Sequence, residues 1–284
     1  EDILAPVRWV RGHNMAKAAV EMAGWDLAAR AEGVSLSQKL GGDRDVVPVG
    51  VSIGLKATDE ELHESVSGYL DDGYARVKIK IKPGRDIEML VGLRERFPDV
   101  AFMADANSAY TLDDVDRLKE LDALDLMMIE QPFSYDDFLD HARLQEQLST
   151  PVCLDESIKS EGDLALAFEL GSCQIVNIKP GRVGGFGVSR RLHDTARDRG
   201  MPVWCGGMLE SGVGRAYNVA LASLPGFSLP GDISASQRYW EQDIVTPEFE
   251  VEDGVMRVPS GVGLGVELDL DRIHGLTTRE ASFG

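Results

Sequence analysis

Five charged residues stand at almost constant spacing in this chain, and each one closes a short apolar run. They are Lys80, Asp105, Glu130, Asp155 and Lys179, separated by intervals of 25, 25, 25 and 24 residues. Carboxylate oxygens are the ligands that Mg²⁺ prefers, and a lysine amine can take up or release a proton. If the five side chains meet, the pattern predicts a divalent-metal site of three carboxylates flanked by two acid/base lysines.

Each acidic residue also has a simpler interpretation. A single Asp at the end of a strand commonly caps the next helix, and Asp155, which precedes Glu156 and Ser157, could do only that. Three acidic strand ends in consecutive repeats are harder to explain as caps. The metal site is therefore the stronger hypothesis.

The apolar runs before these residues predict the elements that position them. The runs RVKIK, VAFMAD, LDLMMIE, PVCLDE and QIVNIK stay apolar almost to their ends, as buried parallel strands do. Amphipathic stretches separate them, and eight strand candidates recur at intervals near 25 residues. We predict an α/β fold, a (β/α)8 TIM-type barrel, because a closed barrel brings all these strand ends to one mouth. The rival, an open doubly wound sheet, would gather its functional residues at one crevice.

The chain divides into three expected segments. Residues 1–45 are expected to be a helical lead-in from a capping domain, and residues 46–243 the catalytic barrel. Residues 244–284 alternate, are rich in glycine, and are expected to pack back outside the barrel as short strands. The chain opens without an initiator Met, so we expect it to begin inside a longer product.

Lysines alternate along the strand that carries Lys80. Lys78, Lys80 and Lys82 face the same side at a period of two, and an inward row of lysines is too unfavourable to be filler. Lys80 would lie at the rim and Lys78 one layer deeper. Lys179 comes four strands after Lys80, which is diametrically opposite in an eight-stranded barrel. The two lysines could therefore remove a proton from one face of a bound carboxylate and deliver a proton to the other.

The composition argues against several classes of protein. A net charge of −19 leaves no basic patch for nucleic acid, and the apolar runs are too short to span a membrane. The three cysteines, Cys153, Cys173 and Cys205, indicate reduced core thiols of a cytoplasmic protein. A catalytic thiol at Cys205 is the weaker alternative. The five histidines fall mostly on polar helical faces, so we expect them at the surface.

Taken together, the motifs resemble the enolase superfamily, in its muconate-lactonising-enzyme-like subgroup. They are KIK at 78–80, DAN at 105–107, EQP at 130–132, DES at 155–157 and NIKPGRVGG at 177–185. Stretches such as GHNMAKAAVEMAGWDL and PVWCGGMLESGVGRAYNVALASLP resemble, more narrowly, the o-succinylbenzoate synthase / N-acylamino acid racemase branch. This narrower resemblance runs through nearly the whole chain.

The resemblance implies a role for each matching residue. The metal ligands would be Asp105, Glu130 and Asp155, binding Mg²⁺ or, in its place, Mn²⁺ or another divalent cation. The acid/base pair would be Lys80 and Lys179. The residues that support this shell would be Lys78, Asn107 and Glu156. The residues that bind the substrate and line its pocket would be Ser52, Arg182, Gly207, Met208 and Leu209.

The implied reaction is Mg²⁺-assisted abstraction of a proton α to a carboxylate, through an enediolate. In o-succinylbenzoate synthesis for menaquinone, Lys80 removes the proton and water leaves from the same face. In N-acylamino acid (N-succinylamino acid) racemisation both lysines act, one on each face. The enzyme is thus expected to be a lyase, an isomerase, or both.

Other reactions stay open at this point. A muconate cycloisomerase-like enzyme or a dipeptide epimerase would use the same superfamily chemistry. An epimerase would show an acidic DxD motif at strand eight, where this chain has Asp232-Ile233-Ser234. An inactive barrel that keeps its metal as structure is the alternative of another class.

The resemblance also sets expectations about the rest of the molecule. Family members begin with an α+β capping domain over the barrel mouth, and we expect this domain to be largely missing from this chain. The expected partner is a small-molecule carboxylate, with no nucleic acid and no membrane. We also expect a homo-oligomer located in the cytoplasm.

Overall fold

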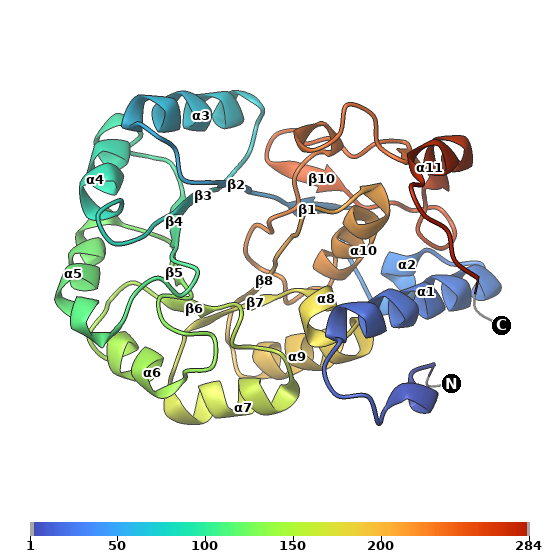
Figure 1. The fold of residues 1–284 in the computed structure, drawn as a ribbon, viewed down its shortest axis with the longest axis horizontal. Helices are drawn as coiled ribbons and strands as arrows, with labels where there is room; N and C mark the ends of the chain where they lie inside the picture. The colour runs from blue at the N-terminus through green and yellow to red at the C-terminus, as the bar shows by residue number, and fades with distance from the viewer. Residues whose placement is uncertain (1–2, 283–284) are drawn as a thin grey trace.

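The centre of the protein is one parallel sheet that curls into a ring (Figure 1). The computed structural model describes residues 3–282. Every neighbouring pair in the sheet is parallel, so all strands end at the same mouth. In sheet order the strands are β2 (Val51–Ile53), β3 (Val77–Lys80), β4 (Phe102–Asp105), β5 (Ile129–Glu130), β6 (Val152–Leu154), β7 (Ile175–Ile178) and β8 (Val203–Cys205).

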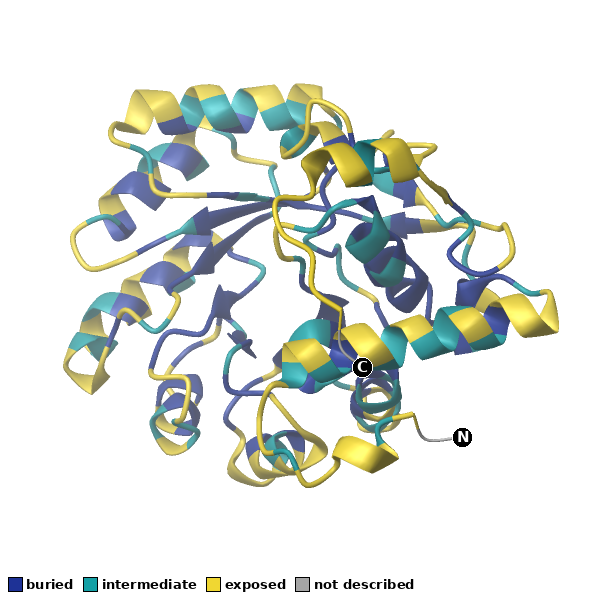
Figure 2. Cartoon of the chain, turned by 45° about the vertical axis from the view of Figure 1, so that its right-hand side comes forward, coloured by how far each residue is buried: buried dark blue, intermediate teal, exposed yellow. Residues whose placement is uncertain are grey.

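Helices connect the strands on the outside of the ring. Figure 2 shows the strands buried and the outward faces of the surrounding helices exposed, which is the pattern of a single barrel core. The predicted alternation of strands and helices, and with it the barrel-type α/β fold, is confirmed. The connecting elements are α3 (Asp59–Asp71), α4 (Ile87–Arg96), η2 (Leu112–Asp114), α5 (Val115–Lys119), η3 (Glu120–Leu124), α6 (Leu139–Gln145), α7 (Glu161–Leu170), α8 (Pro180–Val183), α9 (Phe186–Asp198) and α10 (Gly212–Ala222).

An irregular segment, residues 227–232, closes the ring between β8 and β2. The Gly50 amide donates to the Gly231 carbonyl at 2.7 Å, and the Asp232 amide donates to a carbonyl at the end of β8 at 3.0 Å. The eighth strand predicted here therefore has the right place in the ring. Its pairing is reduced to isolated bridges, because Pro230 has no amide hydrogen to contribute to a ladder.

Side chains that point into the ring form a packed floor beneath the mouth. The Trp204 indole nitrogen donates to the Cys153 sulfur at 3.3 Å, so even the polar atom of this large ring has a partner. A second and larger apolar cluster lies between the sheet and the helices. The floor is therefore rigid, and polar chemistry is confined to the strand ends above it. Its buried members are Met103, Met128, Cys153, Ile175 and Trp204.

The chain that leads into the ring is fixed to its side, beside α8 and α9 (Figure 1). The Glu21 carboxylate accepts the backbone amides of Phe186 and Gly187, both at 2.8 Å, and so satisfies the free N–H groups at the start of α9. A Cβ at Gly185 would lie 2.3 Å from this carboxylate, so the approach requires glycine. The leading elements are η1 (Ala5–Val7), α1 (Asn14–Glu32), α2 (Leu36–Leu40) and β1 (Val46–Pro48).

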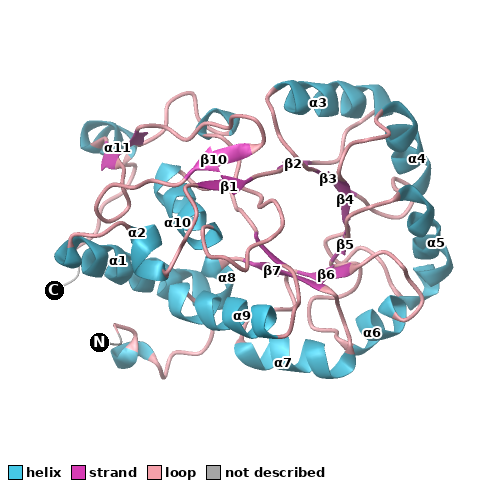
Figure 3. Cartoon of the chain, turned by 180° about the vertical axis from the view of Figure 1, so that it is seen from behind, coloured by secondary structure: helices cyan, strands magenta, loops and turns pink. Residues whose placement is uncertain are grey.

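Short elements follow the ring in sequence and pack beside the elements that precede it, such as β1. Strand β10 pairs antiparallel with β1, and β11 pairs antiparallel with β9, beside the ring as seen from behind in Figure 3. The division into three segments stays a prediction, and residues 1, 2, 283 and 284 of its outer segments lie outside the described part. Within residues 3–282, each helix is too short or too polar to cross a bilayer. The late elements are η4 (Ser236–Arg238), β9 (Val245–Thr246), β10 (Val255–Arg257), β11 (Glu267–Leu268) and α11 (Leu270–Leu276).

Candidate active site

Lys80, Asp105 and Glu130 lie side by side at the mouth of the ring. Lys80 is in register with Asp105, and Asp105 is in register with Glu130, so their side chains share the inner face. The Lys80 amine donates to Asp105 Oδ2 at 2.5 Å. Asp105 is 1% exposed and Glu130 is 0% exposed, whereas the Lys80 side chain is 28% exposed. Lys80 is therefore the member of this group that a substrate can reach.

Asp155 carries the other half of the site. Lys179 Nζ lies 2.7 Å from Asp155 Oδ2, and the Arg182 guanidinium donates to Oδ1. Burial raises the pKa of Asp155, but Arg182 and Lys179 outweigh burial and lower it overall. Burial lowers the pKa of Lys179, yet Asp155 and Glu130 outweigh it and raise it overall. This half of the site is thus a fully ionised cluster.

Glu130 is the weakest acid of the three carboxylates. Its oxygens accept from Lys78 Nζ and Asn177 Nδ2, both at 2.8 Å. Burial and the nearby charges of Asp105 and Asp155 raise the pKa of Glu130 to about 8. Three carboxylates therefore repel one another within one buried space.

These carboxylates fit a divalent cation by their chemistry. All three supply hard oxygen donors, and a cation among them would relieve the repulsion that raises the pKa of Glu130. As they lie here, lysine and arginine side chains hold their oxygens. Within residues 3–282, no three Asp, Glu, His or Cys side chains are grouped so as to hold an ion directly. Lys80 and Lys179 would have to turn aside as the cation enters.

Asn107 and Glu156 lie beside the Lys80–Asp105 pair. Asn107 Oδ1 accepts from Lys80 at 2.5 Å, and Asn107 Nδ2 donates to Glu156 Oε1 at 3.1 Å. The Asn107 amide also donates to Asp105 Oδ1 at 3.0 Å. Asn107 therefore holds the Lys80 amine and the Asp105 carboxylate together, and the supporting role expected of it stays a prediction.

The residues predicted to line the substrate are less closely gathered. Ser52 is half-buried on β2 in register with Lys78, while Arg182 is committed to Asp155. Met208 and Leu209 are 47% and 75% exposed on the loop after β8. Their predicted contact with a substrate remains a prediction.

Two glycines let this loop pass close to the site. A Cβ at Gly206 would lie 2.2 Å from Asn177 Oδ1 and 2.6 Å from Lys179 Cε. A Cβ at Gly207 would lie 1.8 Å from the Asp232 carbonyl oxygen. Gly207, predicted to contact substrate, is therefore required here by close packing against the closing segment.

Three buried residues and the partly buried Asp232, for which the motifs predict no role, also hold the site. Arg76 pairs with Asp232, Asn177 holds Glu130, and the Gln131 side-chain oxygen accepts the Asp155 amide at 3.0 Å. The alternation that singled out the lysines would have found Arg76, because the basic row begins there. Lys82 was the wrong end of that row: β3 stops at Lys80, and Lys82 is exposed.

The expectation that the histidines lie at the surface is wrong for His141 and His193, which are 0% and 1% exposed. His141 Nε2 accepts the Phe133 amide at 3.1 Å, and His193 Nε2 accepts the Gly226 amide at 2.9 Å. Each ring satisfies a loop amide and is buried for that reason. The cysteines are buried as expected, and burial raises the pKa of Cys205, which disfavours a reactive thiolate.

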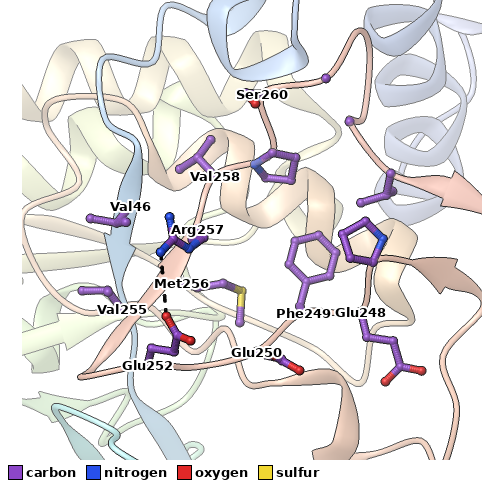
Figure 4. Close-up of a pocket in the computed structure, with 15 residues that line it drawn as sticks. Val46, Glu248, Phe249, Glu250, Glu252, Val255, Met256, Arg257, Val258 and Ser260 are labelled. Carbon is purple, nitrogen blue, oxygen red and sulfur yellow. Dashed lines mark ion pairs between the residues drawn. The ribbon is translucent and has the colours of Figure 1, made fainter.

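A separate surface pocket of about 420 Å³ lies beside β1 and β10, among residues 247–266 (Figure 4). Phe249 and Met256 contribute apolar surface, and Arg257 faces Glu252 across it at 3.9 Å. Its lining comes from Val46 and residues 247–266 rather than from the strand ends. The pocket is thus distinct from the candidate active site.

Family models match most of the chain. "Enolase C-terminal domain-like" matches residues 61–272, and "Mandelate racemase / muconate lactonizing enzyme, N-terminal domain" matches residues 4–41. The first model spans the strands that carry the lysines and carboxylates. The second spans the helical lead-in.

Individual proteins agree with this match. An o-succinylbenzoate synthase of Geobacillus stearothermophilus is 55% identical over 268 residues, covering 94% of this chain and 72% of that protein. An N-succinylamino acid racemase of Thermus thermophilus is 52% identical over 276 residues, covering 97% of this chain and 74% of that protein. A crystal structure of an enolase superfamily member from Listeria innocua superposes with a TM-score of 0.92 at 49% identity, covering 96% of this chain and 74% of that one.

Proposed function

This chain belongs to the enolase superfamily, in its mandelate racemase / muconate lactonizing enzyme group, and we propose that it removes the proton α to a carboxylate with the help of Mg²⁺. The product would be o-succinylbenzoate by dehydration, an inverted N-succinylamino acid by racemisation, or both. The proposal makes the protein a lyase, an isomerase, or an enzyme of both kinds.

One observation carries this proposal. Two lysines from distant strands reach the same group of carboxylates, Lys80 through Asp105 at 2.5 Å and Lys179 through Asp155 at 2.7 Å. Glu130 lies between these carboxylates and feels both of their charges. A structural metal site has no need of two such lysines. An acid/base reaction on the two faces of one carbon does.

We assign the metal-binding role to Asp105, Glu130 and Asp155. When bound there, Mg²⁺ supplies positive charge that holds the substrate carboxylate and stabilises the second negative charge that develops on it. A cation on these oxygens would also release Lys80 and Lys179 from their present ion pairs. Both amines would then be free to face the substrate.

The two lysines have separate roles in the two reactions. In dehydration, Lys80 takes the α-proton to Nζ and assists the loss of water from the same face, while the Lys179 ammonium stabilises the enediolate. In racemisation, Lys80 takes the proton from one face and Lys179 Nζ returns a proton to the other. Arg182, bound to Asp155, would hold the second face in position.

Other activities of the superfamily are less favoured. A dipeptide epimerase would need acidic groups at the eighth position of the ring that are available to a dipeptide amine. Here Asp232 is committed to Arg76 at 2.6 Å and to Lys78 at 2.6 Å, and Ser234 takes the place of a second acid. A muconate cycloisomerase-like reaction and an inactive barrel remain as outcomes of the test below.

Proton NMR in D₂O tests the proposal. The protein with Mg²⁺ is incubated with one enantiomer of an N-succinylamino acid, and its α-proton signal and optical rotation are followed. Loss of the signal together with loss of rotation would support racemisation by two bases. The dehydration substrate is assayed in parallel by the ultraviolet absorbance of the aromatic product. Absence of exchange, racemisation and dehydration would refute the proposal in favour of the inactive barrel or another superfamily substrate.

The proposed partner is a small-molecule carboxylate, and Mn²⁺ or another divalent cation is expected to replace Mg²⁺. The cytoplasm and a homo-oligomeric state stay predictions. Gel filtration with light scattering would measure the oligomeric state.

A further inference from the structure

Lys78, beneath the mouth, is shared by three carboxylates. Its Nζ lies 2.6 Å from Asp232, 2.8 Å from Glu130 and 3.0 Å from Asp105, and its side chain is 4% exposed. The ammonium donates a hydrogen bond to Glu130 Oε2, and Asp105 and Asp232 both lie within ion-pair distance of it. Asp105 and Glu130 are the assigned metal ligands, whereas Asp232 lies in the closing segment and has no part in the assigned metal-binding role.

Asp232 is held from its other side by Arg76. Arg76 Nη1 lies 2.6 Å from Asp232 Oδ1, and Arg76 Nη2 donates to the Pro230 carbonyl at 2.8 Å. Gly50 makes room for this guanidinium, since a Cβ there would lie 2.6 Å from Arg76 Cζ. Both cations also face the Trp204 ring, with Arg76 Cζ 5.3 Å and Lys78 Nζ 5.1 Å from its centre. Asp232 is thus paired with a cation at each of its two side-chain oxygens.

Asp105 and Glu130 therefore pair with the Lys78 ammonium and are also the assigned ligands of the metal ion. An ammonium paired with Asp105 and Glu130 lowers their negative potential and so competes with a metal ion. Each carboxylate oxygen can accept more than one bond, so a cation can still bind from above if Lys78 stays below. Asp232, 2.6 Å from Lys78 Nζ, is the third carboxylate of the group and offsets the charge of this ammonium.

We propose that Asp232 is a positioning residue for metal binding. It pairs with Lys78 at 2.6 Å, offsets the charge of this ammonium, and thereby leaves Asp105 and Glu130 able to hold a divalent cation. Arg76 keeps the Asp232 carboxylate in place for this purpose. The inference rests on the proposed function, because it concerns the affinity of the metal site assigned above.

Titration of the substrate-free protein with Mn²⁺, followed by the electron paramagnetic resonance signal of free Mn²⁺, tests the proposal without an activity assay. Asp232→Asn should weaken Mn²⁺ binding by about 10- to 100-fold, as loss of a supporting carboxylate does at other metal sites. In a Lys78→Met background the same substitution should change the affinity by less than about threefold, because the charge that Asp232 offsets has gone. An affinity of Asp232→Asn within about threefold of wild type would overturn the proposal. So would an equal effect in both backgrounds.

One further variant is a matched control, and a second replaces Asp232→Asn if that protein does not fold. Asp86→Asn removes another buried carboxylate, 2.5 Å from Arg117 and 1% exposed, at the start of α4 outside the ring. It should lower the melting temperature and leave Mn²⁺ affinity unchanged. If Asp232→Asn does not fold, Arg76→Lys takes its place. This change keeps the charge but removes the planar guanidinium that donates to Asp232 and to the Pro230 carbonyl together, so Asp232 is held less firmly. It should weaken binding at least threefold, and unchanged binding would overturn the proposal.

Mn²⁺ binding and α-proton exchange by the wild-type protein distinguish failure of the metal site from failure of the positioning role. A wild-type protein that binds no Mn²⁺ would overturn the assigned metal site and, with it, this inference. A wild-type protein that binds Mn²⁺ and exchanges the α-proton, with Asp232→Asn binding equally well, would overturn the positioning role alone.

Discussion

Replacing Lys179 with methionine removes one amine from the mouth and keeps a side chain of similar length. Lys179 contacts Asp155 at 2.7 Å and is 16% exposed. Under the proposed function, racemisation requires this amine, whereas proton removal by Lys80 does not. We therefore expect the variant to lose racemisation and to keep α-proton exchange with only one of the two enantiomers.

The magnitudes separate a catalytic effect from a structural one. Removing one partner of a buried ion pair costs about 3–5 kcal/mol of unfolding free energy when the other charge is left alone. Asp155 still has Arg182 and lies in a site that is partly open, so we expect about 1–2 kcal/mol here. That corresponds to a fall in melting temperature of about 2–8 °C. Loss of an acid/base group lowers the rate by about 10²- to 10⁴-fold, or about 3–5 kcal/mol in the barrier.

The assay follows each enantiomer of an N-succinylamino acid separately in D₂O, by NMR and by optical rotation, at a temperature well below unfolding. Lys119→Met, on the exposed side of α5, is the matched control and should behave as wild type. Racemisation reduced by less than about tenfold in Lys179→Met would refute the two-lysine mechanism. Loss of exchange with both enantiomers, in a folded protein, would also refute the division of labour between the faces.

Three further outcomes are expected. Saturating Mg²⁺ should raise the melting temperature of the wild-type protein by differential scanning fluorimetry, with about 2.7 kcal/mol at a hundred times the dissociation constant, and a chelator should abolish both this shift and activity. Gly206→Ala places a Cβ against Asn177 and Lys179, so it should lower kcat/KM at least tenfold and destabilise by about 1–3 kcal/mol. In the control Gly92→Ala in α4, the Cβ meets only His63 Nε2 at 4.0 Å, an ordinary contact, so this change should stabilise slightly. Burial lowers the pKa of His141 despite a neighbouring aspartate, so its contribution to stability is present above about pH 6.5 and is lost as the pH falls toward the lowered folded value. Melting temperatures of wild type and His141→Gln between about pH 5 and pH 8 check this, and an equal slope below pH 6.5 in both would contradict it.

The parts of the site that could be predicted from the sequence are those that depend on a strand and its own end. An apolar run fixes both the strand and the position of the charge that closes it, so Asp105, Glu130 and Asp155 were placed correctly at one mouth. Their neighbours in the sheet are also their neighbours in the chain order. Repeat spacing was therefore sufficient information.

The parts that escaped prediction depend on closure of the ring and on single contacts. Arg76 and Asp232 are 156 residues apart in sequence and meet only because closure of the ring brings residues 227–232 beside β2 and the start of β3. His141 lies in a helical stretch whose polar pattern indicates the surface, yet one hydrogen bond to the Phe133 amide holds it inside. Neither contact has a periodic signature in the sequence.

The irregular segment at residues 227–232 is also expected to be the place where the ring opens locally. This joint is held by isolated bridges, whereas the other neighbours in the ring share ladders of hydrogen bonds. We expect the amide hydrogens of Gly231 and Asp232 to exchange with solvent before those of β3 to β7, by local opening rather than by global unfolding. Opening here would let water reach the buried charges beneath the mouth. Local opening of residues 227–232 would therefore control how fast water enters the interior. It would also control how fast proteases cleave the metal-free protein.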